Sequence, residues 1–163
     1  MHQRFVKVAF ARGAQRHPAL SPSPCENRAI GPTHVPKPKA ELDALAALTQ
    51  ARNLIADPEC WTRSAPARAW RAPRKKGAGQ WIPVAATDPA ARRWCASGAL
   101  CKVSGVRSGA PGFSFLDAAA VRLFGVGLGR ANDDPRLGHA DVLRCYDAAI
   151  AAAQAEAGRV RAA

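Results

Sequence analysis

The clearest hydrophobic pattern lies in residues 39–57, where apolar positions recur at the spacing of one helical face and polar residues occupy the other. The central stripe consists of Leu45, Leu48, Ala51 and Ile55. Pro58 follows, and the residue before a proline avoids helical dihedral angles. The pattern therefore predicts a helix that ends before Pro58, onto which Cys60 and Trp61 fold back.

A second helical spacing joins Ala91, Trp94, Cys95, Gly98 and Cys101. Asp88 is a suitable N-cap for a helix whose first residue is Pro89. A glycine inside a helix is unfavourable relative to alanine, so Gly98 predicts that another helix or backbone segment packs closely there. We expect this to be the central helix of a small core.

Two more helices follow the central one. Ser114 and Asp117 form a capping-box-like pair before an apolar stripe over 115–124, and Gly125 is a typical helix end. After a long loop over 126–135, a last helix over 139–157 is predicted to end at Gly158. Its apolar stripe consists of Val142, Tyr146, Ala149, Ile150 and Ala153.

The remaining segments are rich in proline and glycine. In the loop 60–87, a turn at residues 76–80 separates residues 69–71 from residues 81–84, which predicts a short, irregular β-hairpin. Residues 1–38 contain six prolines and predict a disordered tail. We expect a mainly α fold: a bundle of about four helices over 39–158 with this hairpin inserted, and a short tail at 159–163.

Composition adds two points. Alanine supplies much of the apolar content and buries little area, so the four tryptophans become important for the core. The net charge of +12 is concentrated, because residues 1–40 contribute +6, residues 60–87 contribute +6, and the rest of the chain is neutral. This distribution favours an anionic partner, although a solvated surface in an arginine-rich protein would show the same excess.

Several classes are disfavoured. The five cysteines are scattered without a CxxC pair, which excludes the usual zinc-ligand spacing and predicts reduced thiols and a cytoplasmic location. No apolar run is long enough to span a membrane, and the run Val8–Ala11 is too short for a signal peptide. The basic start weakly resembles an organellar transit peptide, although a plain basic arm fits better.

Four blocks resemble a family of small, uncharacterised proteins of bacterial and phage genomes, classed as a domain of unknown function. The blocks are residues 51–55 leading to Trp61, residues 93–100 (RWCASGAL), Asn132-Asp133, and residues 139–143 (HADVL) leading to Asp147 and residues 149–150. The resemblance covers about 41–157. It implies a compact, mostly helical domain and a mobile-element origin, and it implies no catalytic residue.

One constellation is that of a cysteine hydrolase. Cys95 would attack, His139 would shuttle the proton, and Asn132 or Asp133 would orient the imidazole. Such a thiol belongs at a helix N-terminus, whereas the predicted cap at Asp88 places Cys95 about two turns inside its helix. A structural role is favoured: Asn132 and Asp133 would satisfy backbone donors in a loop, and His139 would make a local cap contact.

A second constellation is a basic loop with aromatic residues. Cations neutralise phosphates and indoles stack on bases, so this mixture is typical of nucleic-acid binding. The candidate residues are Arg63, Arg68, Trp70, Arg71, Arg74, Lys75, Lys76 and Trp81. Alternatively, Trp70 and Trp81 close the thin core and leave only the cations exposed.

A third stretch, residues 125–129 (GVGLG), resembles a phosphate-binding loop, but it follows a helix and lacks the closing glycine, so a connector is favoured. No cofactor or metal is expected. The sequence thus predicts a non-enzymatic binding protein with a nucleic-acid partner. The alternatives are an inhibitor-type protein that binds an acidic protein surface, and a cysteine hydrolase. The sequence does not determine the oligomeric state.

Overall fold

The computed structural model describes residues 43–73 and 78–162. The tail predicted for residues 1–38 and the loop cations Arg74, Lys75 and Lys76 lie outside the described residues. Within them, the element order is α1 (Ala44–Leu54), η1 (Pro58–Cys60), β1 (Ala67–Arg71), β2 (Gln80–Val84), β3 (Ala91–Trp94), α2 (Ala96–Ser104), α3 (Phe113–Phe124), α4 (Leu128–Asp133) and α5 (His139–Ala162). The fold is mainly α, with a sizeable sheet.

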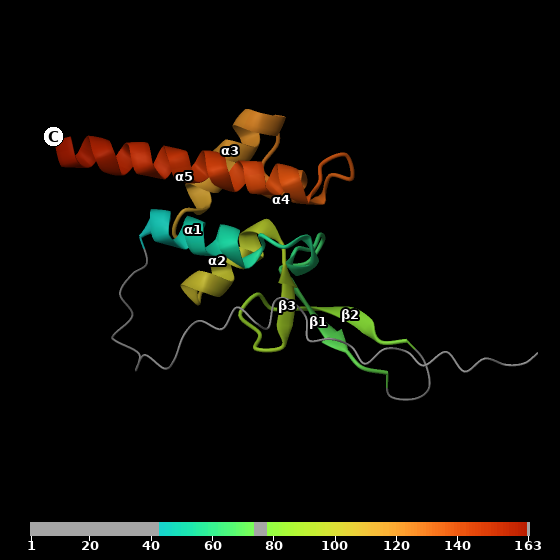
Figure 1. Ribbon diagram of the computed structural model, residues 1–163. Coiled ribbons are helices and arrows are strands. Elements are labelled where there is room, and N and C mark those ends of the chain that lie inside the picture. Colours follow the sequence, from blue (N-terminus) through green and yellow to red (C-terminus); the bar gives the residue numbers. More distant parts are fainter. Residues whose placement is uncertain (1–42, 74–77, 163) are drawn as a thin grey trace, which may run out of the picture.

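The helices form one part of the molecule and the sheet another (Figure 1). Helix α5 packs on α1 and α3, and α1 also packs on α2. The sheet lies at one end of the helices, and the β1–β2 hairpin points away from them (Figure 1). The far end of α5 extends past α1 in the same view.

The predicted apolar stripes form the core. On α1 the side chains of Ala47, Leu48 and Ala51 are buried, and Ile55 directly after it is buried as well. Helices α3 and α5 contribute the buried residues Leu116, Ala119, Ala120, Val142, Cys145, Tyr146, Ala149 and Ala153. These stripes confirm the sequence prediction because helical periodicity places residues three and four apart on one face.

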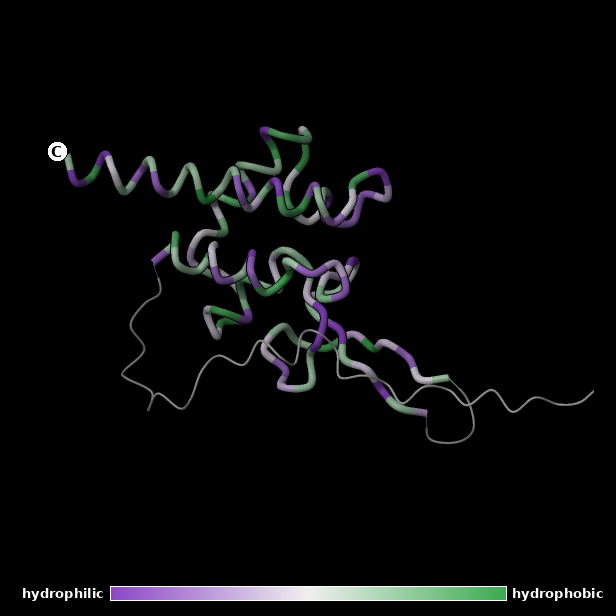
Figure 2. The backbone as a smooth tube through the Cα atoms, viewed as in Figure 1, coloured by the Kyte–Doolittle hydropathy of each residue, from purple (hydrophilic) through white to green (hydrophobic). Residues whose placement is uncertain are grey.

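The predicted hairpin is also confirmed. The sheet is antiparallel with strand order β2-β1-β3, and Trp70 of β1 lies opposite Trp81 of β2. Its inward face carries the buried small residues Ala67, Ala69 and Ala91 and the buried Trp94. Figure 2 shows hydrophobic and hydrophilic residues following one another along these strands.

The prediction of a helix capped by Asp88 is wrong. Residues 91–94 form β3, and Cys95 is the N-cap of α2. The Asp88 side chain instead holds a turn, where it accepts a hydrogen bond from the Ala90 amide at 2.7 Å. The pairing of β1 with β3 contains a bulge: Ala67 lies opposite Trp94 but Ala69 lies opposite Ala91, so β3 has one extra residue. Because of the bulge, Ala91 and Trp94 both point inward although they are three residues apart, which is also the spacing of a helical face.

The close approach predicted at Gly98 is confirmed. A Cβ atom built on Gly98 would lie 1.8 Å from the Pro66 carbonyl oxygen. The Cys95 amide donates to the same oxygen at 3.2 Å. The first turn of α2 thus rests directly on the backbone that leads into β1, and only glycine allows this contact.

The later helices also differ in part from the prediction. Gly112, not Ser114, is the N-cap of α3, and Asp117 accepts instead from the Leu128 amide at 2.7 Å, which caps α4. Helix α4 lies within the segment predicted as a loop over 126–135. Helix α5 continues through Gly158 into the predicted tail. Gly125 does end α3, with a φ of 72°.

The tryptophans do not all serve the core. Trp94 is 5% exposed and its Nε1 donates to the Ala86 carbonyl, whereas Trp70 is 43% exposed.

Tyr146 is the largest fully buried side chain among the described residues, and its hydroxyl donates to the Ala96 carbonyl at 2.6 Å. Burial raises the pKa of Tyr146 well above its usual value. A neutral tyrosine therefore anchors α5 to the start of α2.

Candidate nucleic-acid interface

One face of the sheet points away from the core and carries large side chains. Because Ala67 and Ala69 point inward, Arg68 and Trp70 point outward from the same strand. Trp81 lies opposite Trp70, and Arg93 lies opposite Arg68. We call this set, Arg68, Trp70, Trp81 and Arg93, the outer sheet face.

The two indoles of the outer sheet face contact each other. Their ring centroids lie 5.5 Å apart at an interplanar angle of 63°, an edge-to-face arrangement. The Arg93 guanidinium lies 4.0 Å from the Trp81 ring centroid. Since β1 separates β2 from β3, the Arg93 side chain reaches across β1 to make this cation–π contact. The face is therefore ordered by its own side chains.

The positive charge of this face is not neutralised nearby. Within the described residues, no ion pair joins Arg68, Arg71 or Arg93 to a carboxylate. The strands themselves contain no acidic residue. Arg71, at the end of β1, is exposed. The structure thus places Arg68, Trp70 and Trp81 on one face together with Arg93, whereas the same alternation directs Arg71 to the other face of β1.

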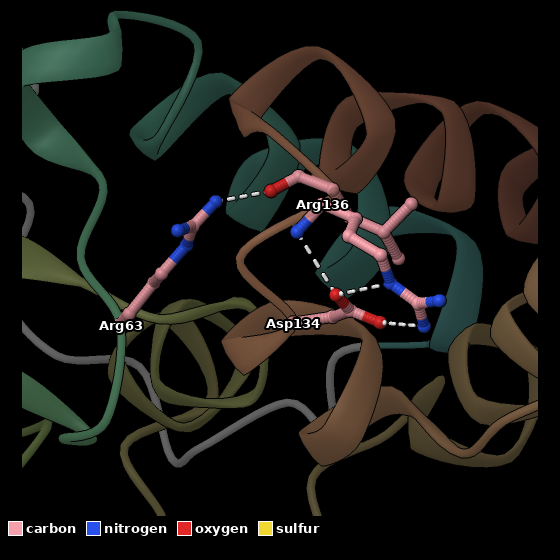
Figure 3. A network of polar contacts seen from close by, with 4 residues as sticks. Arg63, Asp134 and Arg136 are labelled. Carbon is pink, nitrogen blue, oxygen red and sulfur yellow. Dashed lines mark hydrogen bonds and ion pairs between the residues drawn. The ribbon is translucent and has the colours of Figure 1, made fainter.

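Arg63, another candidate from the sequence, does not lie on the outer sheet face. Its guanidinium donates to the Leu137 carbonyl and lies 5.0 Å from the Trp61 ring centroid. Figure 3 shows Arg63 pointing at the loop before α5, beside the pair formed by Asp134 and Arg136. This arginine connects the chain before the sheet to the helices.

Asn132 and Asp133 are structural residues. Asn132 is 4% exposed, and its Oδ1 accepts from the Ala96 amide at 3.1 Å and from Trp61 Nε1 at 3.0 Å. Its Nδ2 donates to the Thr62 carbonyl and to Asp133 Oδ1, and Asp133 also accepts from the Ser64 amide at 2.8 Å. The pair ties α4 to residues 61–64 and to the first turn of α2.

Cys95 lies at the N-terminus of α2, where a reactive thiol would be expected. His139, its predicted partner, does not line the cavity that Cys95 borders. The Cys95 Sγ accepts from the Gly98 amide at 3.3 Å at the start of α2 and borders a cavity of about 220 Å³. The described residues that line the cavity are Ser64, Ala65, Pro66, Cys95, Ser97, Leu128, Gly129, Asn132 and Asp133. His139 is not among them, since its Nε2 lies 2.6 Å from the Ile55 carbonyl oxygen and its ring packs near Trp61. The structure does not assemble the predicted hydrolase constellation.

The other thiols are poor nucleophiles. Burial raises the pKa of Cys101 and raises that of Cys145 to about 11, which keeps both protonated at neutral pH. Cys95, Cys101 and Cys145 are free, as predicted, but Cys60 is disulfide-bonded, so the prediction of reduced thiols is wrong there.

The glycine-rich stretch after α3 is a connector. The amide that begins α4, that of Leu128, already donates to the Asp117 carboxylate, which occupies the place that a bound phosphate would take. Across the described residues, no group of three or more His, Cys, Asp or Glu could hold a metal ion. None of the described helices is long and apolar enough to cross a membrane.

Residues 40–152 match the family of unknown function DUF6197. The chain belongs to this family. No curated protein and no solved structure matches it. The matched DUF6197 region begins before α1 and ends within α5, so it includes the sheet and the Asn132-Asp133 junction.

Arg93 is the residue of the outer sheet face that is absent from the predicted candidates. The helix predicted from Pro89 would include Arg93, whereas residues 91–94 form β3. The signal was present in residues 91–94, where an inward Trp94 follows an outward arginine. Strand alternation would have identified it, had the bulge not concealed the period.

Proposed function

We propose that this DUF6197 protein is a non-enzymatic binding protein of mobile-element origin that contacts nucleic acid from the cytoplasm through its outer sheet face and the adjoining basic loop. The observation that supports it is the arrangement of Arg68 and Arg93 beside two indoles, with Arg71 exposed at the end of the same strand as Arg68 and with no carboxylate of the described residues paired to these arginines. Unpaired arginines keep their full attraction for phosphate. The sheet end that carries them points away from the helices (Figure 1).

The test compares two triple variants of the full chain by fluorescence anisotropy with labelled DNA and RNA. One changes Arg68, Arg71 and Arg93 to Ala, and the matched control changes the exposed arginines Arg122, Arg130 and Arg161. Both remove the same charge. The sheet variant should bind at least about tenfold more weakly and show a shallower salt dependence, by about one unit of slope for each lost phosphate contact. The helix variant should bind nearly as the parent chain does.

In a third variant, Arg74, Lys75 and Lys76 are changed to Ala. Its loss of affinity measures how much the predicted loop contributes to nucleic-acid binding. Equal losses in the sheet and helix variants would mean that only net charge matters, and the assignment to the sheet would be wrong. An absence of binding at low salt would remove nucleic acid as the partner. The remaining candidate would then be an acidic protein surface, which the same cations would fit.

A further inference from the structure

Trp70 stands out among the exposed apolar side chains. It is 43% exposed, and Arg68 lies on the same face of β1. An exposed indole usually marks an interaction site, because it leaves a large apolar area in water. Trp81, its neighbour across the hairpin, is only half-buried. The hairpin therefore offers an aromatic surface to a partner.

The backbone at Gly79 supports the Trp70 ring. A Cβ atom built on Gly79 would lie 2.2 Å from Cζ2 of Trp70, so the indole rests directly on the glycine backbone. Trp81 meets it edge to face, and Arg93 packs on the Trp81 ring. Glycine at position 79 is thus needed for the position of the ring. A ring ordered before binding loses little conformational entropy when a ligand stacks on it.

These features distinguish between kinds of nucleic acid. In a duplex the faces of the bases are covered by their neighbours, whereas an unpaired base leaves a face free to stack on an aromatic side chain. Arg68 and Arg93 flank the indoles and can neutralise the adjoining phosphates. An acidic protein surface would use the arginines but would gain nothing specific from a stacking platform.

We infer that the partner of the outer sheet face is single-stranded nucleic acid, with a base stacked on Trp70 and the backbone passing along Arg68 and Arg93. This inference rests on the proposed function and specifies its substrate class. Stacking is tolerant of base identity because every base has a π face, so recognition by this face is independent of sequence. Besides contacting the backbone, Arg93 holds the Trp81 ring through its cation–π contact.

The experiment measures the affinity of the full chain for a labelled oligothymidylate of about 12 nucleotides, and for the same strand paired with its complement. The parent chain should prefer the single strand by at least about tenfold. Trp70→Ala should weaken single-strand binding by about 5- to 100-fold and leave duplex binding and the salt slope unchanged. Phe113→Ala removes an aromatic residue of similar exposure, 41%, from α3 and should have no effect.

Two conservative variants test the geometry. Trp70→Phe should retain most of the affinity but lose the quenching of tryptophan emission that stacking produces. Gly79→Ala keeps every charge and every aromatic ring, yet it displaces the indole and should weaken single-strand binding in the same direction as Trp70→Ala.

The outcomes separate the two levels of the proposal. Salt-dependent binding that is lost in the sheet arginine variant but unchanged in Trp70→Ala would overturn the inference and leave the proposed function in place. Equal affinity for single strand and duplex would also overturn the inference and leave the proposed function in place. An absence of binding to either oligonucleotide at low salt would overturn both.

Discussion

Several arginines in the helical part of this DUF6197 protein pair with carboxylates, whereas Arg68, Arg71 and Arg93 of the sheet form no ion pair within the described residues. Arg52 of α1 pairs with Asp147 of α5, and Arg144 and Arg159 pair with acidic residues one turn away on α5. In the sheet, Arg93 packs on an indole and Arg71 is exposed. Within the described residues, ion pairing of arginines is thus found among the helices and the loop before α5, and not at Arg68, Arg71 or Arg93.

The two parts also use their large side chains differently. The helices direct Leu48, Leu100, Leu116 and Tyr146 into the core, as amphipathic helices do. The sheet presents alanines to the core and directs Trp70 outward. An ordinary sheet with one solvated face places its apolar residues inward and its polar residues outward. Trp70 departs from this arrangement because it is a large apolar side chain on the outward face, which the proposed binding role would require.

The largest predicted effect concerns the junction of the two parts. Asn132→Ala removes the acceptor of the Ala96 amide and of Trp61 Nε1 in a buried site. Leaving buried donors unpaired should lower the free energy of unfolding by about 3 kcal/mol. Denaturant unfolding would measure this loss. Gln154→Ala, an exposed amide of α5, is the control and should change stability by less than about 0.5 kcal/mol. A loss below about 1 kcal/mol for Asn132→Ala would contradict the role of this junction.

A smaller effect is expected at Gly98. Alanine is the better helix former by about 1 kcal/mol, but here its Cβ would meet the Pro66 carbonyl. Gly98→Ala should therefore destabilise the domain by about 2 kcal/mol, because backbone must move apart. The control is Gly158→Ala on α5, where a Cβ atom meets nothing within 4 Å. That change should stabilise by up to about 1 kcal/mol. Thermal unfolding of both variants gives the signs, and a stabilised Gly98→Ala would show that the contact is absent.

The smallest effect tests charge pairing in the helical part by pH. The Arg136 guanidinium and amide hydrogen-bond to Asp134 and lower the pKa of that carboxyl from 3.8 to about 2. Because the folded pKa lies below the unfolded value, the stabilisation is complete above pH 3.8 and is lost as the pH falls through about 2. Arg136→Ala should return the pKa of Asp134 toward 3.8, as NMR titration would show. Arg159→Ala, far along the chain on α5, should leave it unchanged, and an unmoved pKa in Arg136→Ala would contradict the pairing.

Much of the fold could be predicted from local patterns. The stripe of α1, the stop at Gly125 and the pairing of the two hairpin strands depend on local patterns, and the structure confirms all three. The central helix could not be predicted correctly. Its start was misplaced because Ala91 and Trp94 belong to a bulged strand, whose period is only visible beside β1.

Of the candidate site, the sequence identified the residues of the hairpin but not their arrangement. Arg68, Trp70, Arg71 and Trp81 were expected close together because the predicted hairpin pairs their two segments, and β1 does pair with β2. Arg93 contacts Trp81 of the hairpin because β3 pairs with β1. Arg63 lies away from the hairpin and donates to the Leu137 carbonyl. Both outcomes depend on contacts between residues far apart in the chain.

By itself, the sequence determined the helical stripes, the hairpin and the location of the positive charge, because periodicity, turn residues and net charge are local properties. Only the tertiary structure decided that Cys95 caps α2, that Asn132 joins the two parts and that Trp70 is exposed. The physical reason is that burial and hydrogen bonding of these groups are set by partners distant in sequence. The surface proposed for binding is likewise formed when β3 pairs with the hairpin.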